Sequence, residues 1–379
     1  MTNQKDTFCP APWMTFYVEP NGRVDLCCIA SAQVGNLHER PLKDILRSHK
    51  VIEIKKQMLA NEPVPGCEAC HSGYESSFQH RLVRQFGGRE HGDYQSLDDF
   101  KLKYLDLRWN NTCNYACIYC SADLSSLWAQ IDGVKQIKIT NMRTDMMDLV
   151  MENLENLQEV YLAGGEPLML KENLTILTRL AEVNPDCKII CNTNLSNIKE
   201  NAIFDKINDF KHVQWMVSAE AQHLEYEYIR WPGKWQTFDQ NLRTLKSLGR
   251  PNHTLAFNLV WLNLNGLSIW DYIDHLINIE LDISSVSILP YNMDVWNGPW
   301  HLKHMPQEFL QRVRERMSDA KYHKIYTYQQ NLDFINKHIN DPNHQSNIAT
   351  IKEYLEQLDK SRNLDHRYIF PTVDSYLQS

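Results

Sequence analysis

Short apolar runs alternate with segments of helical periodicity through the middle of the chain. Strands that alternate with helices predict a parallel sheet whose connections cross over in the right-handed sense. Six such units favour an open, partial (β/α)6 barrel of the TIM type over a closed eight-stranded one. The expected strands are 104–108, 159–162, 188–191, 213–218, 255–260 and 285–289, and the expected helices are 146–157, 171–183, 236–248 and 268–279.

The two ends of the chain have different patterns. The segments 16–18 and 23–26 flank the turn sequence Pro20-Asn21-Gly22, which predicts a β-hairpin. A helix is expected over 41–59 and a polar connector over 73–99. Beyond Pro306 the pattern is helical again, at 308–321 and 345–358. We therefore expect three parts: a cysteine-rich module with its connector (1–98), an α/β partial barrel (99–304) and a helical C-terminal extension (305–379).

Composition and charge narrow the class of protein. The 379 residues are 43% hydrophobic and 23% charged, and no apolar run of about 18 residues predicts a membrane span. The first residues lack the apolar stretch of a signal peptide, so a cytoplasmic location is expected. The net charge is −8 without a basic block, which disfavours DNA or RNA as a partner.

Ten cysteines are many for a chain expected in a reducing compartment, where clustered thiols are more often metal ligands than disulfides. Cys187 and Cys191 flank a predicted strand, and we expect both to pack in the core as small apolar residues. The other eight form two groups. The first is Cys9, Cys27, Cys28, Cys67 and Cys70, and the second is Cys113, Cys117 and Cys120.

The second group follows the first predicted barrel strand with the spacing C-x3-C-x2-C. Three thiolates can hold three irons of a [4Fe–4S] cubane and leave the fourth iron without a protein ligand. Structural zinc, the alternative, requires four ligands, and no fourth Cys or His is nearby in sequence. With Tyr119 before the last cysteine, Cys113, Cys117 and Cys120 resemble the cluster motif of the radical S-adenosylmethionine (SAM) superfamily.

This resemblance implies that the open iron binds the amino and carboxylate groups of SAM and passes one electron to the sulfonium. Cleavage then gives a 5′-deoxyadenosyl radical that abstracts hydrogen from a substrate. It also implies that Tyr119 packs near the adenine. Gly164, Gly165 and Glu166, in the Gly-Gly-Glu-Pro after the second strand, match the motif that binds the SAM amino group in this family.

Other polar residues follow the later strands, and in barrels of this type ligands bind at the C-terminal ends of the strands. Ser218 and Arg230 fall where related enzymes place contacts with the SAM carboxylate and ribose, although Arg230 could equally form a surface ion pair. Glu220 stands where many relatives carry Asp. Asn194 and Asn263 are further candidates for SAM contacts. Tyr291, Asn292, Asp294 and Trp296 follow the last strand, where they could line the pocket.

The first cysteine group resembles the auxiliary-cluster modules called SPASM and twitch. The shared features are Cys-x-x-Pro-Trp at the start, a Gly-x4-Cys spacing and a later Cys-x2-Cys. The resemblance implies a second [4Fe–4S] cluster with Cys9, Cys27, Cys67 and Cys70 as ligands. Cys28 could replace Cys27, but the glycine spacing favours Cys27. Zinc in these four thiols is the alternative. Unlike the usual module, this one has too few cysteines for two clusters, and it precedes the barrel.

Together these features predict a radical SAM oxidoreductase or maturase. Relatives with such modules modify peptides, proteins or small molecules, with peptides or proteins slightly favoured here. An electron donor such as flavodoxin or ferredoxin is implied. Two rival functions are a zinc-stabilised, non-catalytic binding protein and a SAM-dependent methyltransferase that acts without radicals. The sequence indicates neither the substrate nor the oligomeric state.

Overall fold

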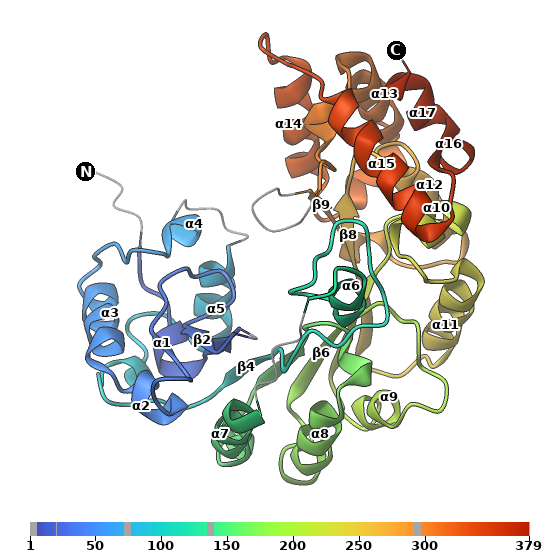
Figure 1. The fold of residues 1–379 in the computed structure, drawn as a ribbon. Helices are drawn as coiled ribbons and strands as arrows, with labels where there is room; N and C mark the ends of the chain where they lie inside the picture. Colours follow the sequence, from blue (N-terminus) through green and yellow to red (C-terminus); the bar gives the residue numbers. More distant parts are fainter. Residues whose placement is uncertain (1–5, 20, 72–76, 135–139, 292–297, 379) are drawn as a thin grey trace. The chain divides into compact units, whose positions relative to one another are not determined.

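The computed structural model describes residues 6–19, 21–71, 77–134, 140–291 and 298–378 (Figure 1). The chain folds into two compact units. The first comprises 1–111, 135–191 and 201–213, and the second comprises 112–134, 192–200 and 214–379.

The N-terminal part of the first unit contains a small antiparallel sheet of strands β1 (Tyr17–Val18), β2 (Arg23–Asp25) and β3 (Gly35–Asn36). Strands β1 and β2 form the predicted hairpin, with Val18 opposite Val24. Gly22 has a φ of +85° in the turn, a conformation that glycine adopts without strain. Pro20 of the predicted turn lies outside the described residues.

The helix expected over 41–59 is two helices, so that prediction was wrong in detail. Helix α2 (Leu42–Leu46) ends before Ser48, and α3 (His49–Leu59) begins after it. The Ser48 side chain accepts a hydrogen bond from the Val51 amide. Serine favours this N-cap role over a helix interior because its hydroxyl bonds to the first free amides.

The connector expected over 73–99 contains a helix that the sequence pattern did not reveal. Helix α5 (Phe78–Phe86) begins at Ser77, whose side chain accepts from the His80 amide. Its buried residues Leu82 and Phe86 pack with Tyr104 of strand β4 (Tyr104–Leu107). The helix was missed because it is short and its apolar stripe makes sense only against that strand. Two more short helices, α1 (Ala11–Met14) and α4 (Glu68–His71), complete this part.

The six predicted barrel strands are confirmed, and they form one sheet of parallel strands in the order β4-β5-β6-β7-β8-β9, which in the described part of the chain does not close. The register places Tyr104 beside Glu159 and Glu159 beside Lys188. The remaining strands are β5 (Glu159–Leu162), β6 (Lys188–Thr193), β7 (Val213–Ser218), β8 (His253–Trp261) and β9 (Val286–Pro290).

Helices α8 (Lys171–Val183), α11 (Trp235–Ser247) and α12 (Ile269–Asn278) follow the prediction to within a residue at each end. The helix expected over 146–157 is instead α7 (Thr140–Met151), followed by the 3-10 helix η2 (Leu154–Asn156). Helices that were not predicted are α6 (Ser126–Ile131), α9 (Ala202–Ile207) and α10 (His223–Ile229).

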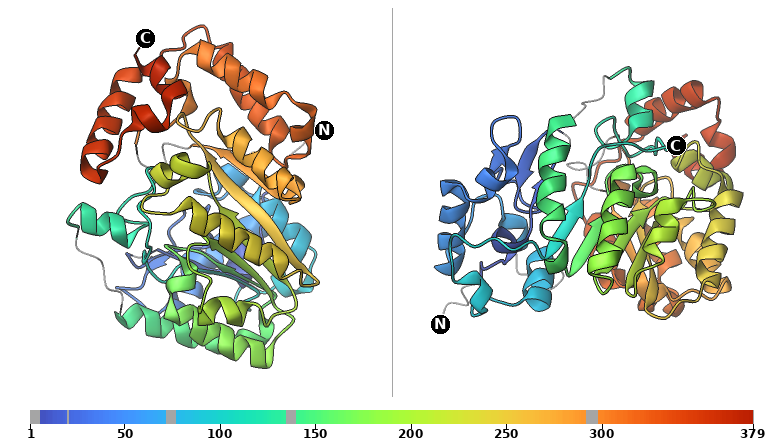
Figure 2. Two further views of the ribbon diagram at one scale, coloured as in Figure 1. Left: turned by 90° about the vertical axis from the view of Figure 1, so that its right-hand side faces the viewer. Right: turned by 90° about the horizontal axis from the view of Figure 1, so that it is seen from below.

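The C-terminal extension is helical, as expected, and its helices lie together in the second unit (Figure 2). Helix α16 (His366–Ile369) contacts α10, and α15 (Ile348–Arg362) contacts α17 (Pro371–Leu377). The expected helices at 308–321 and 345–358 correspond to α13 and α15, with shifted ends. The extension comprises α13 (Gln307–Met317), α14 (Tyr328–Ile339), α15 (Ile348–Arg362), α16 (His366–Ile369) and α17 (Pro371–Leu377). Among the described helices, none combines the length and apolar character that crossing a membrane requires.

Candidate functional site

Four cysteines of the N-terminal part line one cavity in the first unit: Cys9, Cys27, Cys67 and Cys70. They come from three separate segments, because Cys9 precedes α1, Cys27 follows β2, and the last two lie at α4. The other lining residues are mostly apolar: Ala11, Leu26, Ile29, Ala30, Met58, His71, Phe78 and Gln79. The fold thus brings together the four thiols that the sequence proposed as a ligand set.

This cavity disfavours free thiolates. Burial is the main cause that raises the pKa of Cys27 to about 12 and that of Cys67 to about 11, and it raises the pKa of Cys9 well above its usual value. The neighbouring thiols add to each shift through like-charge repulsion. A bound cationic cluster would reverse this balance, because metal ligation deprotonates cysteine outright. Four convergent thiols therefore fit an iron–sulfur cluster.

Cys28 has a different environment from Cys27. It is not among the residues that line the cavity, and its side chain instead makes a hydrogen bond to Asp106 at the end of β4. Burial and the Asp106 carboxylate raise the pKa of Cys28 to about 12. Arg108 donates to both Asp106 oxygens, at 2.9 and 3.1 Å, and its guanidinium lies 5.0 Å from the Tyr17 ring centroid. This cluster was not anticipated from the sequence, where nothing links Cys28 to β4.

The three-cysteine loop lies in the second unit, and neighbouring segments bind its backbone. The Ala116 amide donates to the carbonyl of Trp231 at 2.7 Å, and the Ile118 amide donates to that of Ile229 at 2.9 Å. Cys117 is buried, while Cys113 and Cys120 are half-buried. Outside the loop, the Ser126 hydroxyl accepts from the Cys113 amide at 3.0 Å. The loop therefore has a defined conformation that presents three thiols.

A buried polar group is centred on this loop. It consists of Tyr119, which belongs to the loop, and of Glu220 and Arg230. Arg230 donates through Nε and Nη2 to the two carboxylate oxygens of Glu220, and Nη2 also donates to the Tyr119 hydroxyl at 2.8 Å. Tyr119 in turn donates to Glu220 at 3.0 Å. The remaining Arg230 nitrogen, Nη1, lies 3.9 Å from the Cys117 sulfur. Arg230 is therefore in an ion pair, as the sequence alternative had it, but the pair is buried rather than on the surface.

Two further candidates bind polar neighbours in the second unit. Asn194 Nδ2 donates at 3.0 Å to the side chain of Asn114, which lies between the first two cysteines. Ser218 donates at 3.2 Å to the side chain of Asn192, so the ends of two adjacent strands are linked. Asn194 thus binds a side chain of the three-cysteine loop. The sequence did not indicate this contact because Asn114 is 80 residues away.

Asn263 is fully buried, and its side chain is only partly hydrogen-bonded within the part of the chain that the structure describes. Its Nδ2 donates to the Pro299 carbonyl at 2.9 Å, but Oδ1 has no hydrogen-bond partner within the described residues. A buried acceptor without a donor is costly, and a bound ligand is one way to satisfy it. Asn263 therefore fits a residue that binds a polar cofactor such as SAM.

The Gly-Gly-Glu-Pro segment follows β5 in the first unit. Gly164 has a φ of +107°, and a Cβ there would lie 3.2 Å from the Asn110 carbonyl oxygen. A side chain there would be strained by the backbone conformation and would contact this oxygen tightly. Glu166 is buried and accepts a hydrogen bond from the Leu168 amide at 3.1 Å. Gly165, between Gly164 and Glu166, is half-buried.

The remaining expectations have simple outcomes. Cys187 and Cys191 are 1% and 0% exposed, as expected for core residues. Tyr291 is buried and donates to the Gly298 carbonyl at 2.6 Å. Three residues expected beside it, Asn292, Asp294 and Trp296, lie outside the described residues.

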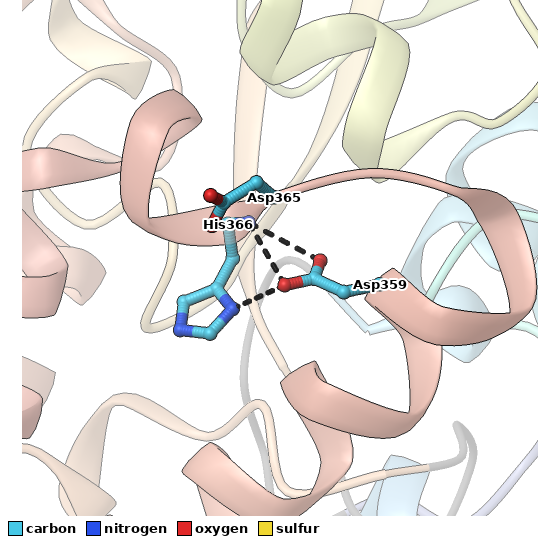
Figure 3. A group of neighbouring side chains, drawn as sticks. All are labelled: Asp359, Asp365 and His366. Carbon is cyan, nitrogen blue, oxygen red and sulfur yellow. Dashed lines mark hydrogen bonds and ion pairs between the residues drawn. The ribbon is translucent and has the colours of Figure 1, made fainter.

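A separate carboxylate and histidine group joins α15 to α16 (Figure 3). His366 Nδ1 lies 2.6 Å from Asp359, which also accepts the Tyr228 hydroxyl at 2.9 Å. Asp365 accepts from Arg367 at 2.9 Å. Since each side chain already has a protein partner, this group serves the packing of the extension.

Comparison with known families agrees with the two cysteine groups. Residues 107–279 match the radical SAM superfamily, and residues 9–71 match SPASM, an iron–sulfur cluster-binding domain. The chain therefore carries a radical SAM domain and, N-terminal to it, a SPASM domain. It is accordingly an enzyme whose cofactors are [4Fe–4S] clusters and SAM.

Relatives in sequence and structure are distant. The chain is 27% identical over 119 residues to the GTP 3′,8-cyclase of Psychromonas ingrahamii and 26% identical over 108 residues to that of Nautilia profundicola. These matches cover 31% and 28% of this chain and about a third of each relative's length (33% and 32%). Similar solved structures include anSMEcpe with bound AdoMet (14% identity, TM-score 0.41, 57% of this chain and 59% of that one). Another is Streptococcus suis SuiB bound to S-adenosylmethionine (13%, 0.40, 72% and 62%).

Proposed function

We propose that this enzyme cleaves SAM reductively and uses the resulting 5′-deoxyadenosyl radical to abstract hydrogen from a substrate, as the first step of an oxidative modification. The observation that carries the proposal is the three-cysteine loop. Its amides at Ala116 and Ile118 are already bonded to neighbouring carbonyls. The backbone of the loop is thus held by neighbouring segments, which supports its three thiols as the proposed ligands.

In this proposal Cys113, Cys117 and Cys120 hold the cluster, which when bound supplies an open iron and one electron. Arg230 places a positive charge 3.9 Å from the Cys117 sulfur. Burial raises the pKa of the Cys117 thiol, and the positive charge of Arg230 opposes that rise. Glu220 holds Arg230 in place through two hydrogen bonds and so acts indirectly.

SAM contacts are proposed for the residues that follow the strands. Asn263 offers a buried acceptor, and Gly164 has a φ of +107° that glycine adopts without strain, so it shapes the turn after β5. Tyr119 is buried beside the loop. The other proposed contacts are Gly165, Glu166, Asn194, Ser218, Glu220 and Arg230.

Cys9, Cys27, Cys67 and Cys70 are the proposed ligands of the auxiliary cluster. Their common cavity supports this set, and the bond of Cys28 to Asp106 supports Cys27 over Cys28. An auxiliary cluster in this place would accept an electron from the substrate radical or bind the substrate. A peptide or protein is the proposed substrate class, with a small molecule as the alternative, and flavodoxin or ferredoxin as the electron donor.

The test is reductive cleavage of SAM by anaerobically reconstituted protein, followed as 5′-deoxyadenosine. We expect Cys117→Ala to abolish it and Cys67→Ala to retain at least part of it. Complete loss in both variants, each folded, would contradict separate roles for the two sites.

The same preparation separates the rival functions. A zinc-stabilised binding protein would contain zinc in place of iron and would release no 5′-deoxyadenosine. A methyltransferase that acts without radicals would form S-adenosylhomocysteine from SAM without any reductant.

A further inference from the structure

Arg362, the last residue of α15, reaches the three-cysteine loop from the C-terminal extension. Its side chain is 8% exposed, and Nη2 donates to the carbonyl of Ala116 at 2.8 Å. Nη1 lies 3.4 Å from the carbonyl of Tyr228, to which it donates. Arg362 thus joins two backbone segments that are 246 and 134 residues away in sequence.

Two tryptophans hold the guanidinium in this position. It lies 5.0 Å from the ring centroid of Trp128 and 5.2 Å from that of Trp231. The negative faces of the two aromatic rings attract the guanidinium. Burial lowers the pKa of Arg362 to about 10, so the side chain remains positively charged at neutral pH.

Three side chains, Arg362 among them, donate hydrogen bonds to three consecutive carbonyls of the loop. Trp128 Nε1 donates to the Cys117 carbonyl at 2.8 Å, and Trp300 Nε1 donates to the Ile118 carbonyl at 3.0 Å. Of the three donors, only Arg362 carries a charge. The carbonyl that it binds belongs to Ala116, the residue before Cys117, so its charge lies next to that part of the loop.

We propose that Arg362 is a positioning residue for the proposed SAM-binding cluster: it fixes the loop at the Ala116 carbonyl and places a permanent positive charge beside Cys117. This inference rests on the proposed function, and it gives the C-terminal extension a role in the chemistry. Reduction adds one negative charge to a cluster. A fixed cation nearby therefore stabilises the reduced form and raises the midpoint potential.

The experiment compares Arg362→Gln with Arg362→Lys in anaerobically reconstituted protein. Glutamine keeps a donor but removes the charge, whereas lysine keeps the charge. Lys360→Gln is the matched control, since it removes one charge from an exposed position of the same helix. The readouts are the midpoint potential of the SAM-binding cluster, from an EPR redox titration, and amide hydrogen exchange over residues 113–120.

For Arg362→Gln we expect the ratio of reduced to oxidised cluster at a fixed potential to fall about tenfold, which is about 59 mV for one electron. Arg362→Lys should stay near the wild-type potential but exchange its loop amides faster, because one of the two carbonyl bonds is lost. Lys360→Gln should match wild type in both measurements. An unchanged potential in Arg362→Gln with full iron content would overturn the proposal.

Failures of the two proposals are distinguishable. If wild-type protein shows no cubane signal after reconstitution, the proposed function itself fails. If Arg362→Gln does not retain iron, Arg362→Lys decides the matter, and wild-type exchange over 113–120 in that variant would refute the positioning role.

Discussion

The buried ion pair of Glu220 and Arg230 lies against the three-cysteine loop, and its contribution to stability can be measured. The Glu220 side chain is 0% exposed and that of Arg230 is 6% exposed. Both carboxylate oxygens are bonded to the guanidinium, and one also accepts the Tyr119 hydroxyl. Water therefore cannot replace either partner when the other is removed.

The expected cost follows from this burial. Glu220→Met leaves an unpaired guanidinium in the interior, and Arg230→Met leaves an unpaired carboxylate. Removing one partner of a buried pair typically costs about 3–5 kcal/mol in the free energy of unfolding. Replacing both partners removes both stranded charges, so the double variant should cost at least about 2 kcal/mol less than the sum of the two single changes.

The assay is urea unfolding of the four proteins, followed by circular dichroism under anaerobic conditions at equal iron content. Arg243→Met is a control, because Arg243 pairs with Asp239 at an exposed position where an ion pair contributes at most about 1 kcal/mol. Additive effects of the two single changes, or single costs no larger than that of the control, would refute the view that the pair is a desolvated unit.

Three further predictions follow from the site and its surroundings. Cys27→Ala should lower the iron content by about four atoms per chain, whereas Cys28→Ala should leave it unchanged; iron loss in the Cys28 variant would contradict the assigned ligand set. Gly164→Ala should weaken SAM binding by equilibrium dialysis at least tenfold, or about 1.4 kcal/mol, since a Cβ at a φ of +107° and 3.2 Å from the Asn110 carbonyl oxygen strains the turn, and wild-type affinity would argue against this. Burial raises the pKa of Glu225 to about 7 from 4.5, so its contribution to stability is present below pH 4.5 and is lost as the pH rises through 7. Glu225→Gln should therefore stabilise the protein by about 1–3 kcal/mol at pH 8, as measured by urea unfolding between pH 4 and 8, and an unchanged pH profile would speak against the shift.

Hydrophobic periodicity predicted the helices and strands whose own residues show which face is buried. Helix α8 and strands β5 and β7 have the predicted ends because each buries a face that its own sequence defines. Helix α5 was missed, since its buried stripe of Leu82 and Phe86 has meaning only against Tyr104. The break between α2 and α3 depended on one capping hydroxyl, which an apolar count over 41–59 does not register.

For the candidate site, local spacing pointed to the chemistry but not to its supports. The C-x3-C-x2-C loop, the Cys-x2-Cys pair and the Gly-Gly-Glu-Pro segment are each contiguous, so their composition alone indicated cluster and SAM binding. The choice between Cys27 and Cys28 could only be suggested by a glycine spacing. It depends on the neighbours that each thiol meets in the fold, which are the cavity for Cys27 and Asp106 for Cys28.

The class of enzyme could be predicted from the order of residues alone. The spacing of three cysteines on one short loop is the same wherever the fold places that loop. Tertiary structure alone decided how the loop is supported. Arg230 and Arg362 approach Cys117 from positions 113 and 245 residues further along the chain, and Glu220 neutralises one of them while two tryptophans hold the other. Coulomb interactions and desolvation depend on distance in space, and a linear pattern carries no information on that distance.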